Sequence, residues 1–180
     1  SMLTKGVDIQ TGYLSAGNFA AADLPGDFTI TMWVNPTSWP GGWWQHAFIG
    51  KDVAPGDTNK WIFAYDNSTN QIYFAYHNAG NPDLNPTAKS GVLGIPTGQW
   101  SHMVVTKNGN TFSFYVNGES AGQDISTVSL PSSINAPLTI GTAESGTFVG
   151  SVSEIAIYDL ALSDSEVSTI YTNQLPIITA

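Results

Sequence analysis

The strongest constraint on the fold is a pair of Asn-Gly dipeptides set between runs of alternating apolar and polar residues. Asn108-Gly109 separates residues 100–107 from residues 111–116, and Asn117-Gly118 follows directly. Asn-Gly supplies the positive φ angles that tight hairpin turns require. The pattern therefore predicts antiparallel strands joined by short turns at the centre of the chain.

The same alternation recurs along the rest of the sequence. In residues 28–34 every second side chain is apolar, while Thr29 and Thr31 face the other way. Aromatic residues alternate in the same manner within residues 61–65 and 72–76. A period of two residues is typical of β-strands, so we expect an all-β chain.

A short helix is expected only near the C-terminus. Ser163 and Glu166 have the spacing of a capping box and precede Val167 and Ile170, which predicts two or three helical turns. Loops rich in Gly, Pro, Asn, Ser or Asp are expected at residues 35–46, 51–59, 78–90 and 119–136. No internal repeat or change of composition divides the chain, so we expect a single domain over residues 1–180, with Ser1 and Met2 as a tag remnant.

The charge balance excludes several classes of partner. Charged residues make up 11% of the chain, the five basic residues are all lysine, and the formal net charge is −9. No basic stripe is available to neutralise phosphates, so we expect neither nucleic acid nor an anionic membrane as partner. Cysteine is absent, which excludes disulfides and thiolate metal sites.

Four segments, taken in order, resemble a known family. They are Phe28-Thr-Ile-Thr-Met-Trp-Val-Asn-Pro36, Gly98-Gln-Trp-Ser-His-Met-Val-Val-Thr106, Phe114-Tyr-Val-Asn-Gly-Glu119, and Leu138-Thr-Ile-Gly141 followed by the segment from Phe148 to Tyr158 and by Ala161-Leu-Ser163. Together they resemble the laminin G-like, concanavalin A-like jelly-roll domains, especially the pentraxin-like branch. The resemblance implies an antiparallel jelly-roll β-sandwich of two sheets with one short C-terminal helix. It says little about the ligand, because this fold carries many functions.

The acidic residues do not match a glycosidase. Retaining glycosidases place two carboxyl groups about 5 Å apart, which relatives with this fold achieve with alternating acids on one strand. The four glutamates, Glu119, Glu144, Glu154 and Glu166, include no alternating pair. We therefore expect no catalytic residue and a protein that is not an enzyme.

Metal sites have weak support. His102 lies in the strand of the second family segment, where a packed framework histidine is expected, and neither His46 nor His77 has a ligand-like partner nearby. The resemblance implies a structural calcium ion near Asp8, Gly50 and Ser153. Ser153, however, stands where many relatives carry an aspartate ligand. The segment from Asp52 to Asp57 is a second, weaker candidate, and its composition favours a turn-rich loop over a calcium site.

A cluster of tryptophans is the most informative feature outside the family pattern. Trp39, Trp43 and Trp44 lie in or beside a Pro-Gly-Gly turn. Indole faces stack on the C–H face of a sugar, while nearby polar side chains bind its hydroxyls. The predicted ligand-binding residues are Trp39, Trp43, Trp44, Gln45, Asp52, Asp57, Tyr65, Tyr76, His77, Asn78 and Asn81. Alternatively, Trp43 and Trp44 point to opposite sides and one of them covers the sandwich.

Two classes of function remain open at this stage. The first is a non-catalytic, lectin-like module that binds a glycan or polysaccharide and belongs to a larger protein with further domains. The second is a structural or interaction module of a virion or a large surface protein or adhesin, in which the tryptophan loop is a protein contact. Either function is expected outside the cell, at the cell surface or on a virion.

Overall fold

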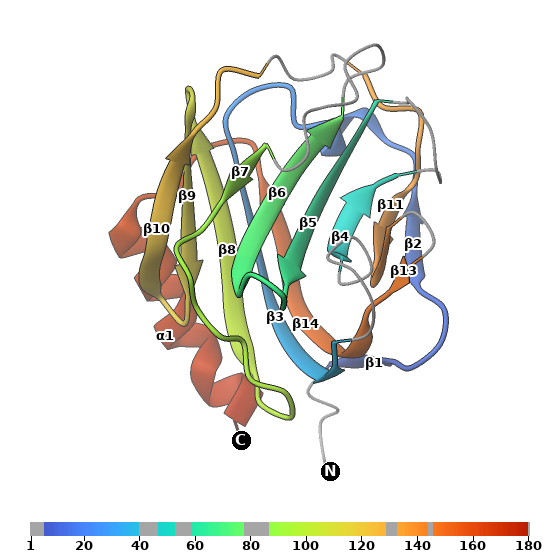
Figure 1. The fold of residues 1–180 in the computed structure, drawn as a ribbon, viewed down its shortest axis with the longest axis vertical. Helices are drawn as coiled ribbons and strands as arrows, with labels where there is room; N and C mark the ends of the chain where they lie inside the picture. The colour runs from blue at the N-terminus through green and yellow to red at the C-terminus, as the bar shows by residue number, and fades with distance from the viewer. Residues whose placement is uncertain are drawn as a thin grey trace.

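The computed structural model describes residues 6–39, 47–52, 59–77, 87–128, 133–143 and 146–179. Within them two large antiparallel sheets of six strands each form the body of the protein (Figure 1). The first sheet contains, in spatial order, β1 (Val7–Ile9), β14 (Val149–Tyr158), β3 (Phe28–Ser38), β8 (Ser101–Asn108), β9 (Thr111–Val116) and β10 (Glu119–Ile125).

The second sheet contains, in spatial order, β2 (Leu14–Gly17), β11 (Leu138–Ile140), β4 (Ala47–Lys51), β5 (Lys60–Asp66), β6 (Gln71–His77) and β7 (Ala88–Lys89). The remaining elements are the small pair β12 (Thr142–Ala143) and β13 (Gly146–Thr147), the 3-10 helix η1 (Ala20–Ala22) and the helix α1 (Asp164–Thr179). This arrangement confirms the expected two-sheet jelly-roll sandwich with a C-terminal helix.

The core lies between the inner faces of the two sheets. From β3, Phe28, Ile30, Met32 and Val34 are all fully buried there. The Phe74 ring of β6 lies 5.0 Å from that of Phe28, measured between ring centroids. These contacts join opposite sheets, so the alternation seen in the sequence is the inner face of each strand.

Both predicted turns are present. The loop between β8 and β9 is Gly109-Asn110, closed by the pairing of Asn108 with Thr111. The turn between β9 and β10 has positive φ angles at Asn117 (53°) and Gly118 (79°). Both angles match the left-handed geometry that Asn-Gly adopts in tight hairpins. The central part of the first sheet is therefore confirmed as a series of hairpins.

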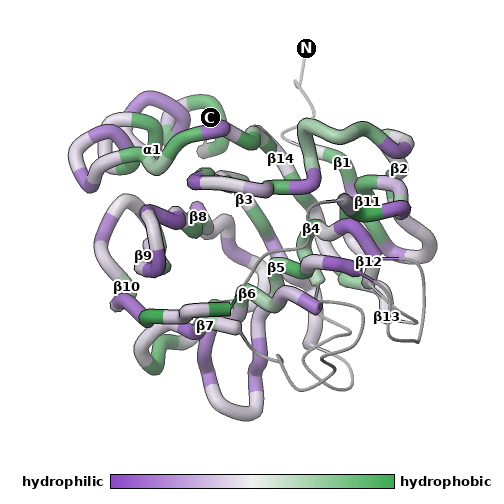
Figure 2. The backbone as a smooth tube through the Cα atoms, turned by 90° about the horizontal axis from the view of Figure 1, so that it is seen from above, coloured by the Kyte–Doolittle hydropathy of each residue, from purple (hydrophilic) through white to green (hydrophobic). Residues whose placement is uncertain are grey.

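The helix α1 is longer than predicted and covers the outer face of the first sheet, so that Figure 2 shows three layers. It spans 16 residues and includes Pro176. Its Tyr171 ring stacks on Trp33 at 5.5 Å between centroids, and Gln174 Oε1 accepts a hydrogen bond from Trp33 Nε1 at 2.8 Å. Tertiary contacts of this kind extend a helix beyond the limit that its Ser- and Thr-rich sequence suggests.

Two predicted loops are partly strand. Residues 119–125 form the edge strand β10, and β3 continues to Ser38. Hydrogen bonding to a neighbouring strand overrides the low strand propensity of such Gly-, Ser- and Pro-containing segments. No helix within the described residues is long and apolar enough to cross a membrane.

Candidate functional site

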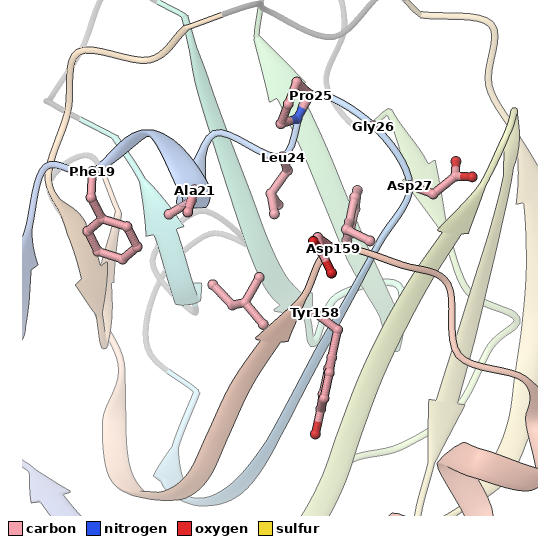
Figure 3. A pocket seen from close by; sticks show the side chains of 11 residues that line it. Phe19, Ala21, Leu24, Pro25, Gly26, Asp27, Tyr158 and Asp159 are labelled. Carbon is pink, nitrogen blue, oxygen red and sulfur yellow. The ribbon is translucent and has the colours of Figure 1, made fainter.

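A cavity of about 520 Å3 opens on one flank of the sandwich, beside the C-terminal half of β14 (Figure 3). β1 pairs only with residues 150–152 of β14, while β3 pairs along its whole length. The end of β14 therefore has no strand on its outer side among the described residues. We call this cavity the flank cleft. It is lined by Phe19, Ala21, Ala22, Leu24, Pro25, Gly26, Asp27, Phe28, Ile157, Tyr158 and Asp159.

One wall of the flank cleft is the segment of residues 19–27, and buried polar atoms of the second sheet hold it in place. Lys51 Nζ donates to the Phe19 carbonyl oxygen at 3.1 Å and forms an ion pair with Asp23 at 2.5 Å. Trp61 Nε1 donates to the Ala22 carbonyl oxygen at 2.8 Å. Because these donors lie in the core, each would be costly to leave unpaired. They therefore fix the wall relative to the second sheet.

The backbone of this wall is strained at Leu24. Its φ angle is 57°, in the left-handed region that non-glycine residues seldom adopt, although its side chain is almost fully buried. The Tyr76 hydroxyl donates to the Leu24 carbonyl oxygen at 3.1 Å. Strained conformations persist only where the surroundings impose them, and they cluster at functional sites.

Two aromatic side chains border the flank cleft and remain open to solvent. Phe19 is 43% exposed and Tyr158 is 36% exposed. In Figure 3, Phe19 lies beside η1, and Tyr158 extends from the end of β14 in a direction away from Phe19 and Leu24. The lining of the cleft is mostly apolar, which is typical of small-molecule sites.

Two carboxylates belong to the cleft and have different surroundings. Asp27 points away from Leu24 and Pro25 in Figure 3. Its Oδ1 accepts a hydrogen bond from the Gly109 amide at 2.8 Å and lies 3.6 Å from Lys107 Nζ. Asp159 is exposed and makes no hydrogen bond or ion pair with the described part of the chain. Asp159 is therefore the carboxylate available to a ligand.

The predicted tryptophan site is only partly described. Trp43, Trp44, Gln45, Asp57, Asn78 and Asn81 lie outside the described residues, as does His46. Their role in binding stays a prediction. Trp39 is described and half-buried, and its indole nitrogen donates to the Ile95 carbonyl oxygen at 3.2 Å. Its ring packs against Tyr65 with 4.7 Å between centroids, so much of this indole contributes to packing.

The other predicted binding residues that the structure describes are buried. Tyr65 and Tyr76 belong to the core cluster and present no ring face to solvent, contrary to the expectation of a second aromatic surface. Both side chains lie on the inner face of the second sheet. The alternation in the sequence predicts which residues share a face, but it does not tell which of the two faces is buried. Asp52 is also buried and lies 3.7 Å from Lys60 Nζ, and His77 is buried opposite Lys60 in the strand register.

His102 is a buried framework histidine, as expected. Its Nε2 lies 2.6 Å from Thr31 Oγ1, and its ring lies 5.1 Å from that of Trp33. Burial lowers the pKa of His102 from 6.5 to about 4, because desolvation disfavours the imidazolium. The ring is therefore neutral at physiological pH.

The residues implied as calcium ligands lie in different sheets. Asp8 and Ser153 belong to β1 and β14, whereas Gly50 belongs to β4. The Gly50 carbonyl oxygen accepts a hydrogen bond from Thr139 at 3.3 Å, and Asp8 accepts one from Gln10 at 2.8 Å. The described residues contain no group of three or more His, Cys, Asp or Glu side chains that could hold a metal. This arrangement does not favour the implied ligand set, and calcium binding stays a prediction.

The residues of the flank cleft were not predicted from the sequence. Asp23-Leu-Pro-Gly-Asp27 reads as a turn, and Tyr158 reads as the last residue of the closing strand. The one sequence feature that could have indicated a binding site here is the neighbouring aromatic and acidic pair, Tyr158 and Asp159, at the end of a predicted strand. Nothing in the sequence shows that a segment more than a hundred residues earlier lies beside it.

The family model of the concanavalin A-like lectin/glucanase superfamily matches residues 8–168, and the chain belongs to this superfamily. A search of curated protein sequences found no match. Similarity to known structures therefore supplies the remaining comparisons.

Several solved structures are similar to this one. The CBM40 domain of Ruminococcus gnavus IT-sialidase, bound to α2,3-sialyllactose, has a TM-score of 0.69 and 14% identity over 92% of this chain and 96% of that chain. Domain 4 of an extracellular GH43 arabinanase from Geobacillus stearothermophilus, in complex with arabinotriose, has a TM-score of 0.63 and 18% identity over 83% and 69%. A mutant of Trypanosoma rangeli sialidase has a TM-score of 0.64 and 17% identity, but the match covers only 29% of that longer chain. At these identities the likeness shows the fold.

Proposed function

We propose that this protein is a non-catalytic glycan-binding module and that the flank cleft is its binding site. The observation that carries the proposal is one mostly apolar cavity whose lining includes the half-exposed residues Phe19 and Tyr158 and the exposed Asp159. A sugar offers an apolar C–H face to such rings and hydroxyl donors to such a carboxylate.

The rigidity of the wall also supports binding. A ligand that meets a preformed site loses less free energy to ordering than one that must organise a loop. The contacts of Lys51, Trp61 and Tyr76 to the backbone of residues 19–24 hold the wall before any ligand arrives.

The comparisons support this proposal at the level of the fold. Two of the similar structures are domains in complex with oligosaccharides, sialyllactose in one and arabinotriose in the other. We further propose that the protein works outside the cell, as part of a larger protein, because one of these relatives belongs to an extracellular arabinanase.

The test is a glycan array followed by titration calorimetry with the best neutral and acidic oligosaccharides. Phe19→Ala and Tyr158→Ala should each weaken binding by about threefold to tenfold, the loss expected for one aromatic contact. Tyr13→Ala is the matched control, because Tyr13 is 59% exposed and does not line the cleft. Binding that is equally strong in all three variants would contradict the proposed site.

The predicted tryptophan site is tested in the same experiment. If Trp43→Ala and Trp44→Ala abolish binding while Phe19→Ala and Tyr158→Ala leave it unchanged, glycans bind at residues 39–44 instead of the flank cleft. If the wild-type protein binds no glycan, the exposed apolar residues of this flank fit the alternative of a protein-interaction module. Leu160, which is 48% exposed next to the cleft, would then be part of the contact.

A further inference from the structure

The charged groups around the flank cleft determine which glycans it accepts. Among the residues that the structure describes, the cleft is lined by two carboxylates, Asp27 and Asp159, and by no basic side chain. One lysine, Lys5, lies outside the described residues. The chain contains no arginine, the residue that binds carboxylates best through its paired donors. Any cation that met an acidic sugar would therefore have to be a lysine.

The lysines that reach cleft residues are already committed to aspartates. Lys51 contacts the Phe19 carbonyl oxygen, but its side chain is fully buried and forms an ion pair with Asp23. Lys107 lies 3.6 Å from Asp27 and is 8% exposed. An arriving carboxylate would have to displace these aspartates from partly desolvated pairs, which is costly.

The other described lysines are not available to the cleft. Lys60 is buried 3.7 Å from Asp52. Lys89 is exposed, but it lies in β7, at the edge of the second sheet opposite to β2. The flank cleft is beside β14 and η1, near the β1 and β2 edges of the two sheets.

The whole molecule adds to this local effect. Its formal net charge is −9, so an anionic ligand approaches against a repulsive field at low ionic strength. A neutral sugar meets no such barrier, and its hydroxyls donate hydrogen bonds to the carboxylate of Asp159.

We infer, resting on the proposed function, that the flank cleft selects neutral glycans and rejects sialylated and other carboxylate-bearing ones. This selectivity distinguishes the protein from the structurally similar CBM40 domain, whose structure has sialyllactose bound.

The experiment compares neutral oligosaccharides with their sialylated counterparts, using lactose against 3′-sialyllactose and a matched set of longer glycans, with arabinotriose as a neutral pentose probe. Binding is measured on the intact chain by calorimetry and array at low and at physiological salt. Wherever a neutral glycan binds, its sialylated counterpart should bind at least about tenfold more weakly at low salt, because its carboxylate enters a cleft that Asp159 lines and is repelled by that charge. The difference should shrink as salt screens the repulsion.

A charge-reversal variant separates the effect of the Asp159 carboxylate in the cleft from the effect of the net charge of the whole protein. Asp159→Lys should reduce the preference for neutral glycans at least about fivefold, because it places a cation in the cleft. Glu119→Lys changes the net charge equally at an exposed position of β10, on the opposite flank, and should leave most of the preference intact.

Equal or tighter binding of the sialylated counterparts by the wild-type protein would overturn the inference while leaving the proposed glycan-binding function standing. An equal change of preference in Asp159→Lys and Glu119→Lys would also overturn it, because selection would then not arise in the cleft. Absence of all glycan binding would overturn the proposed function and the inference with it.

Discussion

At the scale of single residues, burial changes what a side chain can do more than its type does. Tyr65, Tyr76 and Asp52 have the chemistry of a sugar site, yet all three are buried and serve packing or pairing. Tyr158 and Asp159 have the same chemistry at an exposed strand end. Which aromatic residue can contact a ligand therefore depends on its face and its neighbours.

His102 gives a prediction at this scale. Its pKa in the folded protein is about 4, below the value of about 6.5 expected in the unfolded chain. The unfolded state therefore binds more protons between these values, and stability falls as pH falls. We expect the free energy of unfolding to decrease by about 2 kcal/mol from this residue between pH 7 and pH 5.

The measurement is urea unfolding at both pH values, for the wild-type protein and for His102→Gln. The variant is expected to be less stable at pH 7, because it disturbs the contact with Thr31, but its stability should depend less on pH. An identical pH dependence in the two proteins would show that His102 does not titrate as described.

At the scale of elements, the structure confirms the capping box that the sequence predicts at the N-terminus of α1. The Ser163 amide donates to Glu166 Oε2 at 2.8 Å, and the Ser163 hydroxyl donates to the same oxygen at 2.7 Å. These bonds, the one from the backbone amide first, lower the pKa of Glu166. A capping box involves residues three positions apart, so it is readable from sequence.

We expect Ser163→Ala to lower the free energy of unfolding by about 1 kcal/mol, because it removes the cap of a helix that covers the first sheet. Ser168→Ala is the control, since Ser168 is exposed inside α1 and alanine is the better helix former. Chemical unfolding of both variants checks the expectation. Equal losses in the two would mean that the cap contributes nothing specific.

The length of α1 illustrates the opposite case. The sequence predicts two or three turns, and the helix continues through Pro176. Stacking of Tyr171 on Trp33 and the bond from Trp33 to Gln174 stabilise the later turns. These partners lie more than a hundred residues apart in the chain, and no local pattern reveals their contact.

At the scale of the whole molecule, the ion pair of Lys51 and Asp23 links the second sheet to the wall of the flank cleft. Lys51 also donates to Asn18 Oδ1 at 2.9 Å. A buried pair of this kind contributes less than its Coulomb attraction suggests, but removing one partner leaves the other charge unpaired.

We expect Asp23→Ala to lower the free energy of unfolding by about 3 kcal/mol, because the Lys51 ammonium would stay buried without its counter-ion. The double variant Asp23→Leu with Lys51→Met should lose less, since it buries no charge. Both are measured by urea unfolding. A larger loss in the double variant would show that the pair itself, and not the orphaned charge, governs stability.

The sequence by itself determined the fold class, the central hairpins and the start of α1, because each depends on periodicity or on residues a few positions apart. The net charge of −9 also predicts, without reference to the fold, that phosphate-rich partners are disfavoured. Only the tertiary structure decided which aromatic residues face the core and where a cavity opens. The flank cleft joins residues 19–28 to residues 157–159, and the side a strand presents to the core depends on its partner in the other sheet.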